Sequence, residues 1–441
     1  MGKIKLIRNG PAILGGNPYN PRPTPRYNTI GDAEKAAVMS VLDDGELSGF
    51  IASPGKEFNG GARVQALEEA FRTFFGTKHA LSVNSATSGL HAAVAAMDIG
   101  PGDEVIVPPY TMSATATVVV MMGATPIFAD IEDQTFGLDP QAVEAAISPR
   151  TRGIIAVNLF GHPARLTELR AIADQHKFFL IEDNAQAPDA VCDGRKTGTI
   201  GDAGVFSFNR HKTMQSGEGG IVLTNDDRIA RKVSLFRNHG EAVADAFGLD
   251  GDDLINHCGL NLRMSEMEAA VALCQFRKLE ALNKQRIAFA DRITAGLSRL
   301  PGLTPPLLRE NCRNVYYFYA MKFDEAEVGM PRDLFCKAVT AEGYLARAGY
   351  VRPLYLEPMY QKLTAIGRHG FPFSANPHIT KDTYTKGICP VVERMHEREF
   401  FLTNIIYPPF TEADMDGFVN ACSKVIEHKD SLLEARAAGV V

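Results

Sequence analysis

The sequence predicts an α/β protein, with a large domain built on a seven-stranded, mostly parallel sheet and a smaller α/β domain at the carboxyl terminus. Three observations lead to this prediction. The chain has 441 residues, which is more than one hydrophobic core usually supports. Between about residues 64 and 225, short β-rich runs alternate with longer helical patterns. Several of these runs are apolar almost throughout, as in strands that are covered on both faces.

Seven segments have the strand pattern. In chain order they are HALSVNS (79–85), EVIVPP (104–109), TPIFADI (125–131), GIIAVNLFG (153–161), FFLIEDNAQA (178–187), AGVFSFN (203–209) and GGIVLTN (219–225). Helical patterns with Pro or Gly near their ends accompany them, at ARVQALEEAFRTFFG (62–76), ATSGLHAAVAAM (86–97), PQAVEAAI (140–147) and ARLTELRAIADQHK (164–177). Most of these helices are the crossover connections that a mostly parallel sheet needs.

A long helical pattern covers residues 259–297, and the segments after it contain more prolines. We therefore place a domain boundary near residue 285, between a large domain (1–285) and a small domain (286–441). Residues 1–61 and 240–258 are rich in Gly, Pro, Asn and Asp and have no clear period, so they are predicted to be loops that cover a site or an interface. Within the first of these segments, residues 47–61 are the expected mobile lid.

Composition excludes several classes of function. The net charge of −6 and the pI near 6.0 provide no basic face for nucleic acid or an anionic membrane. A signal-peptide apolar run and an 18-residue apolar window are both missing, so a cytoplasmic protein is expected. The seven cysteines are an odd number without a C-x-x-C pair, which predicts reduced thiols and neither a disulfide framework nor a metal site.

Ligands in open α/β sheets collect at the carboxyl ends of the strands. In VNSATSGLHAA (83–93), a strand ends in small polar residues and opens directly into a helix. The free N–H groups at such a helix start suit a phosphate, with Ala86, Thr87 and Ser88 as donors. The alternative is simple capping of the helix by Ser85 or Thr87, and the pattern alone does not decide between the two.

Two other strand ends carry reactive groups. In LIEDNAQA (180–187), Asp183 is either an ion-pair partner or an acid placed against a cationic ligand nitrogen, and Gln186 is close enough to share the site. In FSFNRHKTMQSGEGG (206–220), Ser207 lies on the strand and Lys212 just beyond it, before glycines that let the backbone approach a ligand. FRNHG (236–240) is a fourth polar segment.

A phosphate cradle, an acid and a strand-end lysine 29 residues after that acid form one chemical set. Pyridoxal 5′-phosphate needs all three: a lysine amine for its aldehyde, a carboxylate for its pyridine nitrogen, and a helix start with hydroxyls for its phosphate. The sequence therefore predicts this cofactor. For acid–base work the pKa of Lys212 must fall well below about 10.4, which desolvation and the charge of the cofactor can cause.

These segments, in this order, are similar to those of the DegT/StrS family of PLP-dependent sugar aminotransferases of fold type I. The resemblance covers most of the chain and rests on GPGDEVIVPPYT, FADIEDQTFGLDP, LIEDNAQA, GDAGVFSFNRHKTMQSGEGGIVLTND, FRNHG, GLNLRMSEMEAA and the C-terminal CPVVERMHEREFFLTNIIYPPFTEADMDGFVNA. It implies a fold type I aminotransferase that acts as a homodimer with shared active sites.

The resemblance also implies roles for single residues. Lys212 would bond covalently to the cofactor, Asp183 would hold the pyridine nitrogen, and Gln186 would lie beside the ring hydroxyl. The phosphate would be held by Ala86, Thr87 and Ser207, and Asn238 would reach the phosphate of the neighbouring subunit.

Two features depart from the family. An aromatic residue usually follows the Thr of the family's P-x-x-T motif and stacks on the cofactor ring, but Met112 occupies that position here. We expect Met112 to cover the ring by a thioether contact, with Tyr110 as the alternative. The segment 47–61 is also longer than is usual in the family, so the resemblance does not predict how the substrate end of the site is formed.

The predicted reaction is ping-pong transfer of an amino group from glutamate or glutamine to a keto sugar, either nucleotide-linked or an unactivated sugar or keto-cyclitol. A sugar 3-dehydratase of the same family would have histidine in place of Lys212, and here the histidine, His211, lies one position earlier. An NAD-dependent sugar oxidoreductase would need G-x-G-x-x-G, which is missing. A non-catalytic regulator is the last alternative. Candidate contacts to a substrate phosphate are Lys56, Arg63, Arg347 and Arg352.

Overall fold

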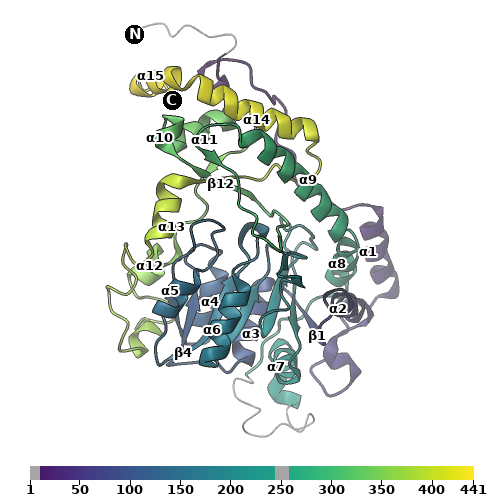
Figure 1. Cartoon of the computed structure of the whole chain (residues 1–441). Coiled ribbons are helices and arrows are strands. Elements are labelled where there is room, and N and C mark those ends of the chain that lie inside the picture. The colour runs from purple at the N-terminus through teal and green to yellow at the C-terminus, as the bar shows by residue number, and fades with distance from the viewer. Residues whose placement is uncertain (1–9, 244–257) are drawn as a thin grey trace.

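The computed structural model describes residues 10–243 and 258–441 and shows an α/β protein with a large and a small part (Figure 1). The large part contains one seven-stranded sheet. Across the sheet, its strands are β1 (His79–Val83), β9 (Gly220–Thr224), β8 (Ala203–Ser207), β5 (Phe179–Asp183), β4 (Thr151–Val157), β2 (Glu104–Val107) and β3 (Thr125–Phe128). Only β9 runs antiparallel to its neighbours, so the predicted mostly parallel sheet is confirmed.

Helices cover both faces of this sheet, which explains why its strands are apolar on both sides. Alternate residues of β4 show the two faces: Ile155 and Val157 pack in one core cluster, Ile154 and Ala156 in another. The first cluster includes α3 (Ala86–Ala96), α4 (Ala114–Met121) and α7 (Asp227–Arg237), and the second includes α5 (Pro140–Ala145) and α6 (Leu166–His176). With α2 (Ala62–Phe75), all four predicted helices are present.

Among the helices that the sequence did not predict are α7, α4 and a helix in the amino-terminal segment. The segment that forms α4 is a run of Val, Thr and Ala, whose β-branched residues disfavour helix, but burial against the sheet overrides that preference. Helix α1 (Asp32–Asp44) corrects the prediction that residues 1–61 are loops. It begins where Glu34 accepts a hydrogen bond from the Gly31 amide, and the Lys278 amine, 2.6 Å from the same carboxylate, ties it to the start of α9.

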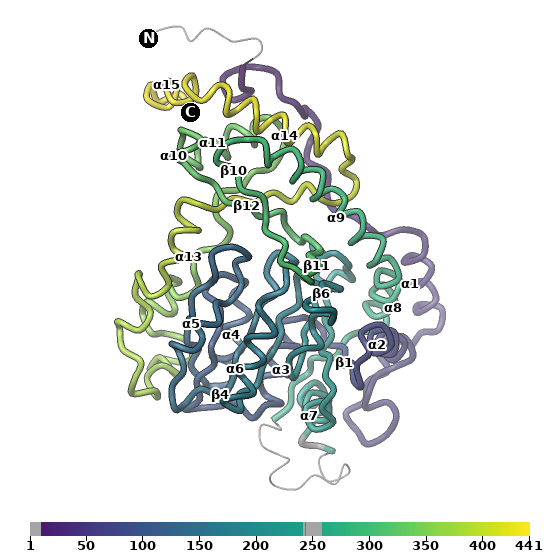
Figure 2. Tube along the Cα trace, in the orientation of Figure 1, coloured from purple at the N-terminus to yellow at the C-terminus, as the bar shows by residue number. Residues whose placement is uncertain are grey.

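The long helical pattern at 259–297 forms two helices rather than one, α8 (Glu266–Phe276) and α9 (Leu279–Leu297). Helix α9 runs from the large sheet toward the C-terminal part of the protein (Figure 2). Residue 285 lies inside this helix, so the chain has no linker at the expected boundary, and the division into two domains stays a prediction.

The small part is built on a four-stranded antiparallel sheet. Its order is β10 (Leu303–Thr304), β12 (Tyr319–Phe323), β14 (Phe400–Thr403) and β13 (Arg347–Ala348). Helices α9, α11 (Arg332–Ala341), α14 (Glu412–Glu427) and α15 (Lys429–Ala437) share its core. Leu14, near the amino terminus, packs in the same core, whereas Tyr355, Phe373 and Tyr384 pack with the large sheet.

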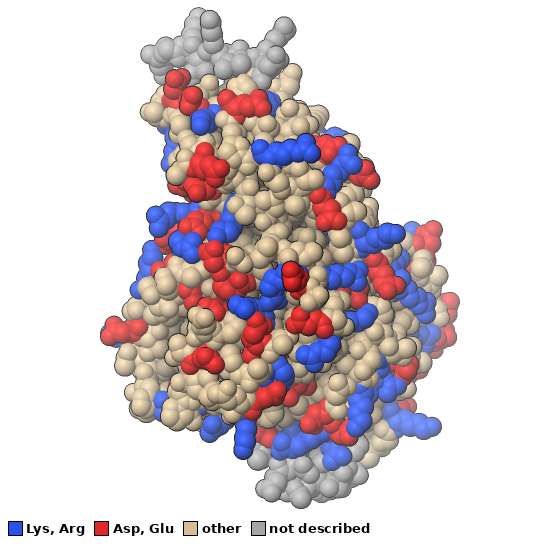
Figure 3. All heavy atoms as spheres, viewed as in Figure 1, with Lys and Arg blue, Asp and Glu red and all other residues tan. Residues whose placement is uncertain are grey.

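A third, three-stranded sheet joins the two parts, in the order β11 (Cys312–Arg313), β6 (Val191–Cys192) and β7 (Arg195–Lys196). The remaining elements are single turns or short helices: η1 (Ala12–Leu14), η2 (Lys56–Asn59), η3 (Leu159–Gly161), η4 (Gly240–Val243), α10 (Glu325–Val328), η6 (Leu354–Leu356), α12 (Pro358–Gln361), η7 (Phe373–Ala375), α13 (Pro390–Arg394) and the π-helical turn η8 (Met395–Glu399). The helices of the described residues show no membrane-spanning feature, because none of them is both long enough and apolar enough to span a bilayer. On the face drawn in Figure 3, basic and acidic side chains are interspersed.

Candidate active site

The carboxyl ends of β5 and β8 lie side by side and bring the acid and the lysine segment together. Asp183, the last residue of β5, pairs in register with Val205, two residues before Ser207 at the end of β8. The Asn184 amide donates to the Val205 carbonyl over 2.8 Å and continues the pairing past Asp183. Both predicted strand-end groups therefore lie at one edge of the sheet, as expected for an α/β ligand site.

Lys212 lies in the turn that follows β8. Its backbone amide donates to the carbonyl of Asn209 over 2.8 Å, which closes the turn, and its Nζ lies 4.6 Å from the centre of the Tyr317 ring. Desolvation lowers the pKa of Lys212 to about 8, while the negative charge of Asp183 acts in the opposite direction. A substantial fraction of this amine is neutral near pH 8, as acid–base chemistry requires.

Asp183 is buried, and its carboxylate is oriented by two donors. The Thr115 hydroxyl donates to Oδ2 over 2.8 Å and the Ala185 amide to Oδ1 over 3.2 Å. Burial raises the pKa of Asp183, while the bond from Thr115 and the charge of Lys212 lower it. The sequence analysis missed Thr115, because nothing in the ATATVVV run of α4 distinguishes this threonine from its neighbours.

The structure shows one of the two alternatives that the sequence left open at the start of α3, the capping by Ser85, and phosphate binding there stays a prediction. Ser85 caps the helix by accepting a hydrogen bond from the Ser88 amide over 3.0 Å, so Ser88 does not supply a free donor. Within the described residues, the amides of Ala86 and Thr87 make no recorded hydrogen bond and remain available to an anion. Ser207 pairs in register with Gly220 on β9.

Gly220 places Ser207 next to this helix start. A Cβ at Gly220 would lie 2.7 Å from the Ala86 nitrogen and 2.7 Å from the Phe206 oxygen, so only glycine allows β9 to pass between the end of β8 and the start of α3. The preceding Gly219 has a φ of +138°, which L side chains rarely adopt. These two glycines bring Ser207 close to Ala86.

Gln186 is held rigidly beside the carboxyl edge. Its Oε1 accepts from the Phe160 amide over 2.9 Å, and its Nε2 donates to the Tyr350 hydroxyl over 3.3 Å. The structure thus adds Tyr350 and Tyr317 to the site. Neither could be found from the sequence, because both lie more than 100 residues beyond Lys212 in segments without a motif.

Met112 and Tyr110 have opposite environments. Met112 is 59% exposed, in the turn that leads into α4. Tyr110 is fully buried, its hydroxyl accepts from the Tyr350 amide over 2.9 Å, and burial raises its pKa. Tyr110 is therefore part of the core, which favours Met112 as the residue available to a cofactor ring. That contact stays a prediction.

Asn238 is fully buried, and its side chain is bonded within its own chain. Its Nδ2 donates to the carbonyls of Ile51 (3.2 Å) and Phe58 (3.0 Å), and its Oδ1 accepts from Arg263 over 3.2 Å. These bonds anchor the segment 47–61, which was expected to be a mobile lid. A contact between Asn238 and another subunit, and a lid movement, both require these bonds to break, and both stay predictions.

A pocket of about 810 Å³ opens beside Lys212, with Tyr317 and Tyr350 in its wall. Its other lining residues are Arg26, Tyr27, Asn28, Ile30, Arg210, His211, Gln215, Arg286, Phe318, Asn404 and Tyr407. Among the described residues that line it there are three arginines and a histidine, but no Asp or Glu. Such a lining favours an anionic ligand.

The four basic residues chosen from the sequence are not part of this lining. Arg63 forms an ion pair with Asp44, and Arg347 donates to the Tyr350 carbonyl over 2.6 Å. The amino-terminal segment supplies Arg26 and Tyr27 instead, which agrees with the expectation that it covers a site.

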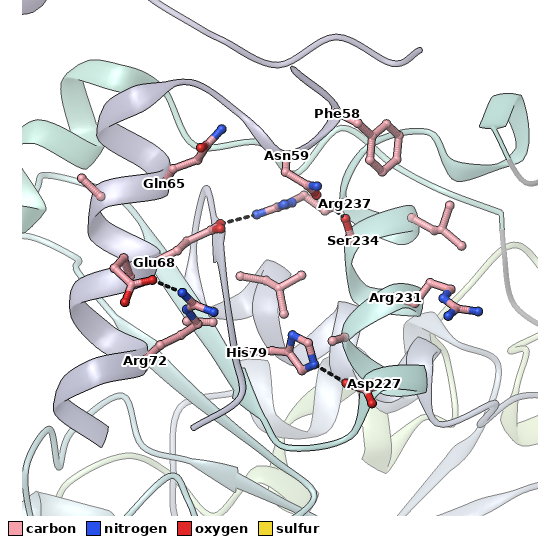
Figure 4. A pocket seen from close by; sticks show the side chains of 16 residues that line it. Phe58, Asn59, Gln65, Glu68, Arg72, His79, Asp227, Arg231, Ser234 and Arg237 are labelled. Atoms are coloured by element: carbon pink, nitrogen blue, oxygen red, sulfur yellow. Dashed lines mark hydrogen bonds and ion pairs between the residues drawn. The ribbon is translucent and has the colours of Figure 1, made fainter. Parts of the chain in front are cut away.

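A second pocket, of about 850 Å³, lies between α2, β1 and α7 (Figure 4). Six of its charged or titratable groups are paired with one another: Arg237 with Glu68 at 2.7 Å, His79 with Asp227 at 2.7 Å, and Arg72 with Glu69. None of the residues predicted for cofactor binding lines this pocket. None lines the pocket of about 810 Å³ either, but two residues in the wall of that pocket contact predicted site residues: the centre of the Tyr317 ring lies 4.6 Å from the Lys212 amine, and Tyr350 is bonded to Gln186. The candidate active site is therefore the one at that pocket.

A mostly parallel sheet with one reversed strand, carrying a desolvated lysine and a buried aspartate at its carboxyl edge, defines the class of PLP-dependent aminotransferases. The sequence profile of the DegT/DnrJ/EryC1/StrS aminotransferase family matches residues 50–416. The chain belongs to this family and is a PLP-dependent aminotransferase.

Relatives match over nearly the whole chain. The spore coat polysaccharide biosynthesis protein SpsC of Bacillus subtilis is 31% identical over 405 residues, which are 91% of this chain and 96% of SpsC. The solved aminotransferase from Psychrobacter cryohalolentis is 27% identical with a TM-score of 0.79, covering 92% of this chain and 99% of that one. DesI, solved in the presence of its TDP-sugar product, is 29% identical with a TM-score of 0.79, covering 98% and 100%.

The residues present fit pyridoxal 5′-phosphate. The helix start at Ala86 and Thr87 offers unbonded amides to a phosphate, Ser207 adds a hydroxyl beside them, and Asp183 places a buried carboxylate near the Lys212 amine. Each group that the cofactor needs has a partner of the right chemistry at the same edge of the sheet.

Proposed function

We propose that this aminotransferase moves an amino group from glutamate or glutamine to a nucleotide-linked keto sugar by a ping-pong mechanism. The observation that carries the proposal is the desolvated Lys212 amine, electrostatically coupled to buried Asp183, beside a pocket lined with arginines. Support for the sugar comes from DesI, solved with a TDP-sugar product, and from SpsC, a polysaccharide biosynthesis protein.

Bound pyridoxal 5′-phosphate supplies an aldehyde that bonds to amines and a ring that withdraws electrons from them. Lys212 would hold the cofactor through its neutral amine and, when that amine is free, would move a proton as the general acid–base. Asp183 would keep the ring nitrogen protonated, with its carboxylate oriented by the hydrogen bond from Thr115. Gln186 would hold the ring hydroxyl.

The remaining assigned residues bind and position. The Ala86 and Thr87 amides and the Ser207 hydroxyl hold the phosphate, and Met112 covers the ring. Arg26 and Arg210 bind the anionic part of the substrate, a diphosphate or an amino-acid carboxylate, because no described carboxylate in the pocket competes for them. An uncharged keto-cyclitol would not use these arginines.

The enzyme works as a homodimer with shared active sites. Several large apolar side chains are exposed on the chain, among them Met39, Leu42, Leu47 and Ile51 on and after α1, and Met112 at the candidate site. Exposed apolar side chains of this kind are typical of a surface that packs against another subunit. A dimer that buries these apolar side chains would place a second chain beside the cofactor.

Lysine replacement tests the proposal. The Lys212→Ala variant should lose both the absorbance of covalently bound cofactor and the release of 2-oxoglutarate from glutamate, or of the corresponding oxo acid from glutamine. The matched control is Lys337→Ala, which replaces an exposed lysine on α11 and should behave like the wild type. Full turnover by Lys212→Ala would rule out the assignment.

A comparison of acceptor substrates tests whether the acceptor is a nucleotide-linked sugar. We expect a nucleotide-linked keto sugar to exceed an uncharged keto-cyclitol in kcat/KM by about tenfold for each charge-assisted hydrogen bond of about 1.5 kcal/mol to an arginine. Arg210→Ala should reduce this preference and leave the half-reaction cofactor spectrum unchanged. Equal kcat/KM values for the two acceptors would contradict the nucleotide-sugar assignment while leaving amino transfer intact.

A further inference from the structure

Cys192 and Cys312 face each other in the three-stranded sheet that joins the large and small parts. The two residues are direct partners in the antiparallel pairing of β6 and β11. Beside them, the Asp193 amide donates to the Asn311 carbonyl over 3.0 Å. Because opposed residues alternate between hydrogen-bonded and non-hydrogen-bonded pairs, Cys192 and Cys312 occupy a non-hydrogen-bonded position.

This position suits a disulfide. Non-hydrogen-bonded pairs have Cα atoms about 4.5 Å apart, which lies within the range of about 4.4–6.8 Å that disulfides span. Both side chains project from the same face of the sheet and belong to one apolar cluster, in which Cys192 is buried and Cys312 packs as a half-buried neighbour. Both cysteines are free thiols in the structure.

The surrounding contacts hold the two strands in register. The buried Asp189 carboxylate forms ion pairs with Lys196 on β7 (2.8 Å) and with Arg313 on β11 (2.7 Å). Three residues before Asp189 lies Gln186, and four residues after Arg313 lies Tyr317. A covalent bond between β6 and β11 would therefore join the segments that carry these two site residues.

We propose that Cys192 and Cys312 form an oxidisable dithiol site, which a peroxide converts into a reversible disulfide between β6 and β11. The sequence analysis found no disulfide framework, because the two cysteines lie far apart in the chain and have no motif. Only the pairing of two very short strands brings them together.

The order of oxidation follows from the environment of each thiol. The hydrogen bond from Cys192, together with the charge of Arg309, lowers the pKa of Cys312, and the same bond raises the pKa of Cys192. Cys312 is also the more exposed of the two. It is therefore the sulfur that carries thiolate and meets an oxidant first.

The chemistry balances with one peroxide. The Cys312 thiolate attacks a peroxide oxygen, the O–O bond breaks, and a sulfenic acid and hydroxide form. The Cys192 sulfur then attacks the Cys312 sulfur, the S–O bond breaks, and the hydroxyl leaves as water with the Cys192 proton. Two thiols lose two electrons, and one peroxide becomes two waters. An external dithiol reverses the bond by exchange.

The test uses full-length holoenzyme in which Cys258→Ser and Cys274→Ser remove the other cysteines that are not buried. After treatment with hydrogen peroxide, we expect the intact mass to fall by two hydrogens and a non-reduced digest to contain the Cys192 and Cys312 peptides linked together. The midpoint of thermal unfolding should rise, because the bond restricts the unfolded chain between positions 192 and 312. Dithiothreitol should reverse both changes.

Adding Cys312→Ser to the same background is the control, since a half-buried serine is tolerated and the peroxide-dependent mass and stability changes should disappear. A linked peptide pair other than Cys192 with Cys312, a link between two chains, or oxidation to sulfinic acid without a link would each overturn the proposal. These readouts do not involve amino transfer, so they are independent of the proposed function.

Discussion

The hydroxyl group of Thr115 is the one side-chain donor among the two donors described for the Asp183 carboxylate at the carboxyl edge of the sheet. Burial raises the pKa of this carboxyl, and the Thr115 hydrogen bond is the first of the contacts that oppose the rise. A carboxylate that must stay charged in a desolvated site depends on such donors, since each one favours the ionised form.

Removing the hydroxyl without changing the shape of the side chain should slow the enzyme. For Thr115→Val we expect kcat to fall by about tenfold or more, in line with the loss of a hydrogen bond to a charged group of about 1.5 kcal/mol or more. Steady-state kinetics with glutamate would measure it. Thr117→Val, on the same helix but not bonded to Asp183, is the control. A wild-type rate for Thr115→Val would remove Thr115 from the proposed site.

The lowered pKa of Lys212 predicts a pH dependence for cofactor capture. The neutral amine is the form that bonds to an aldehyde, and protonation removes it as pH falls below about 8. The rate at which apoenzyme takes up pyridoxal 5′-phosphate should therefore rise about tenfold per pH unit below about 8 and level off above it. Absorbance-monitored mixing would measure the rate, and a midpoint near about 10.4 would contradict desolvation of this amine.

At the scale of residues, the sequence predicted those groups that lie in local motifs. Asp183, Ser207 and Lys212 end strands that are apolar and easy to recognise, and the structure places all three at one edge of the sheet. Thr115 and Tyr317 could not be predicted, because their position at the site depends on how α4 and the C-terminal segment pack and not on any local pattern.

Among the elements, helix α3 begins at one capping residue, Ser85. Ser85 accepts a hydrogen bond from the Ser88 amide and leaves the Ala86 and Thr87 amides free. Ser85 thus stabilises the helix without using the amides that the proposed phosphate contact needs, so capping does not exclude phosphate binding.

Cap removal should weaken both stability and cofactor binding. Ser85→Ala is expected to lower the free energy of unfolding of the apoenzyme by about 1 kcal/mol and to raise the Kd for pyridoxal 5′-phosphate. Urea unfolding and a binding titration would measure the two effects. Ser113→Ala is the matched control, since Ser113 precedes α4 but makes no capping hydrogen bond. Equal effects of the two variants would contradict the role of Ser85.

The seven strands were predictable because burial on both faces leaves a continuous apolar signal. Helices α1 and α4 were not predictable for opposite reasons. The α1 sequence lies among Gly- and Pro-rich segments and depends on Lys278, far along the chain, whereas α4 is rich in the β-branched residues of strands. In both, tertiary packing overrides the local sequence signal.

For the whole molecule, Asn238 provides the test of the proposal that each active site uses residues of two chains. Asn238 is bonded inside its own chain, to the segment 47–61 and to Arg263, although the family resemblance assigns it to the neighbouring subunit. The two assignments predict different behaviour of mixed dimers.

Co-expression of Lys212→Ala with Asn238→Ala distinguishes them. If the site is shared, a mixed dimer contains one site with both native residues, and random pairing should restore about a quarter of the wild-type activity. If Asn238 acts within its own chain, no site recovers both residues. Sedimentation velocity of the wild type should give a species of twice the 48.0 kDa chain. A mixture no more active than the average of the two parents would contradict shared sites.

The amino-terminal segment has a consequence for how this protein is made. Leu14 packs in the same core as Leu432 and Ala435, and Lys424 donates to the carbonyl of Asn17, 407 positions earlier. Leu14 is therefore buried only when Leu432 and Ala435 are also present. During synthesis on the ribosome, the small core cannot close before these two residues have emerged, so its apolar surface stays exposed to chaperones longer than that of the large sheet.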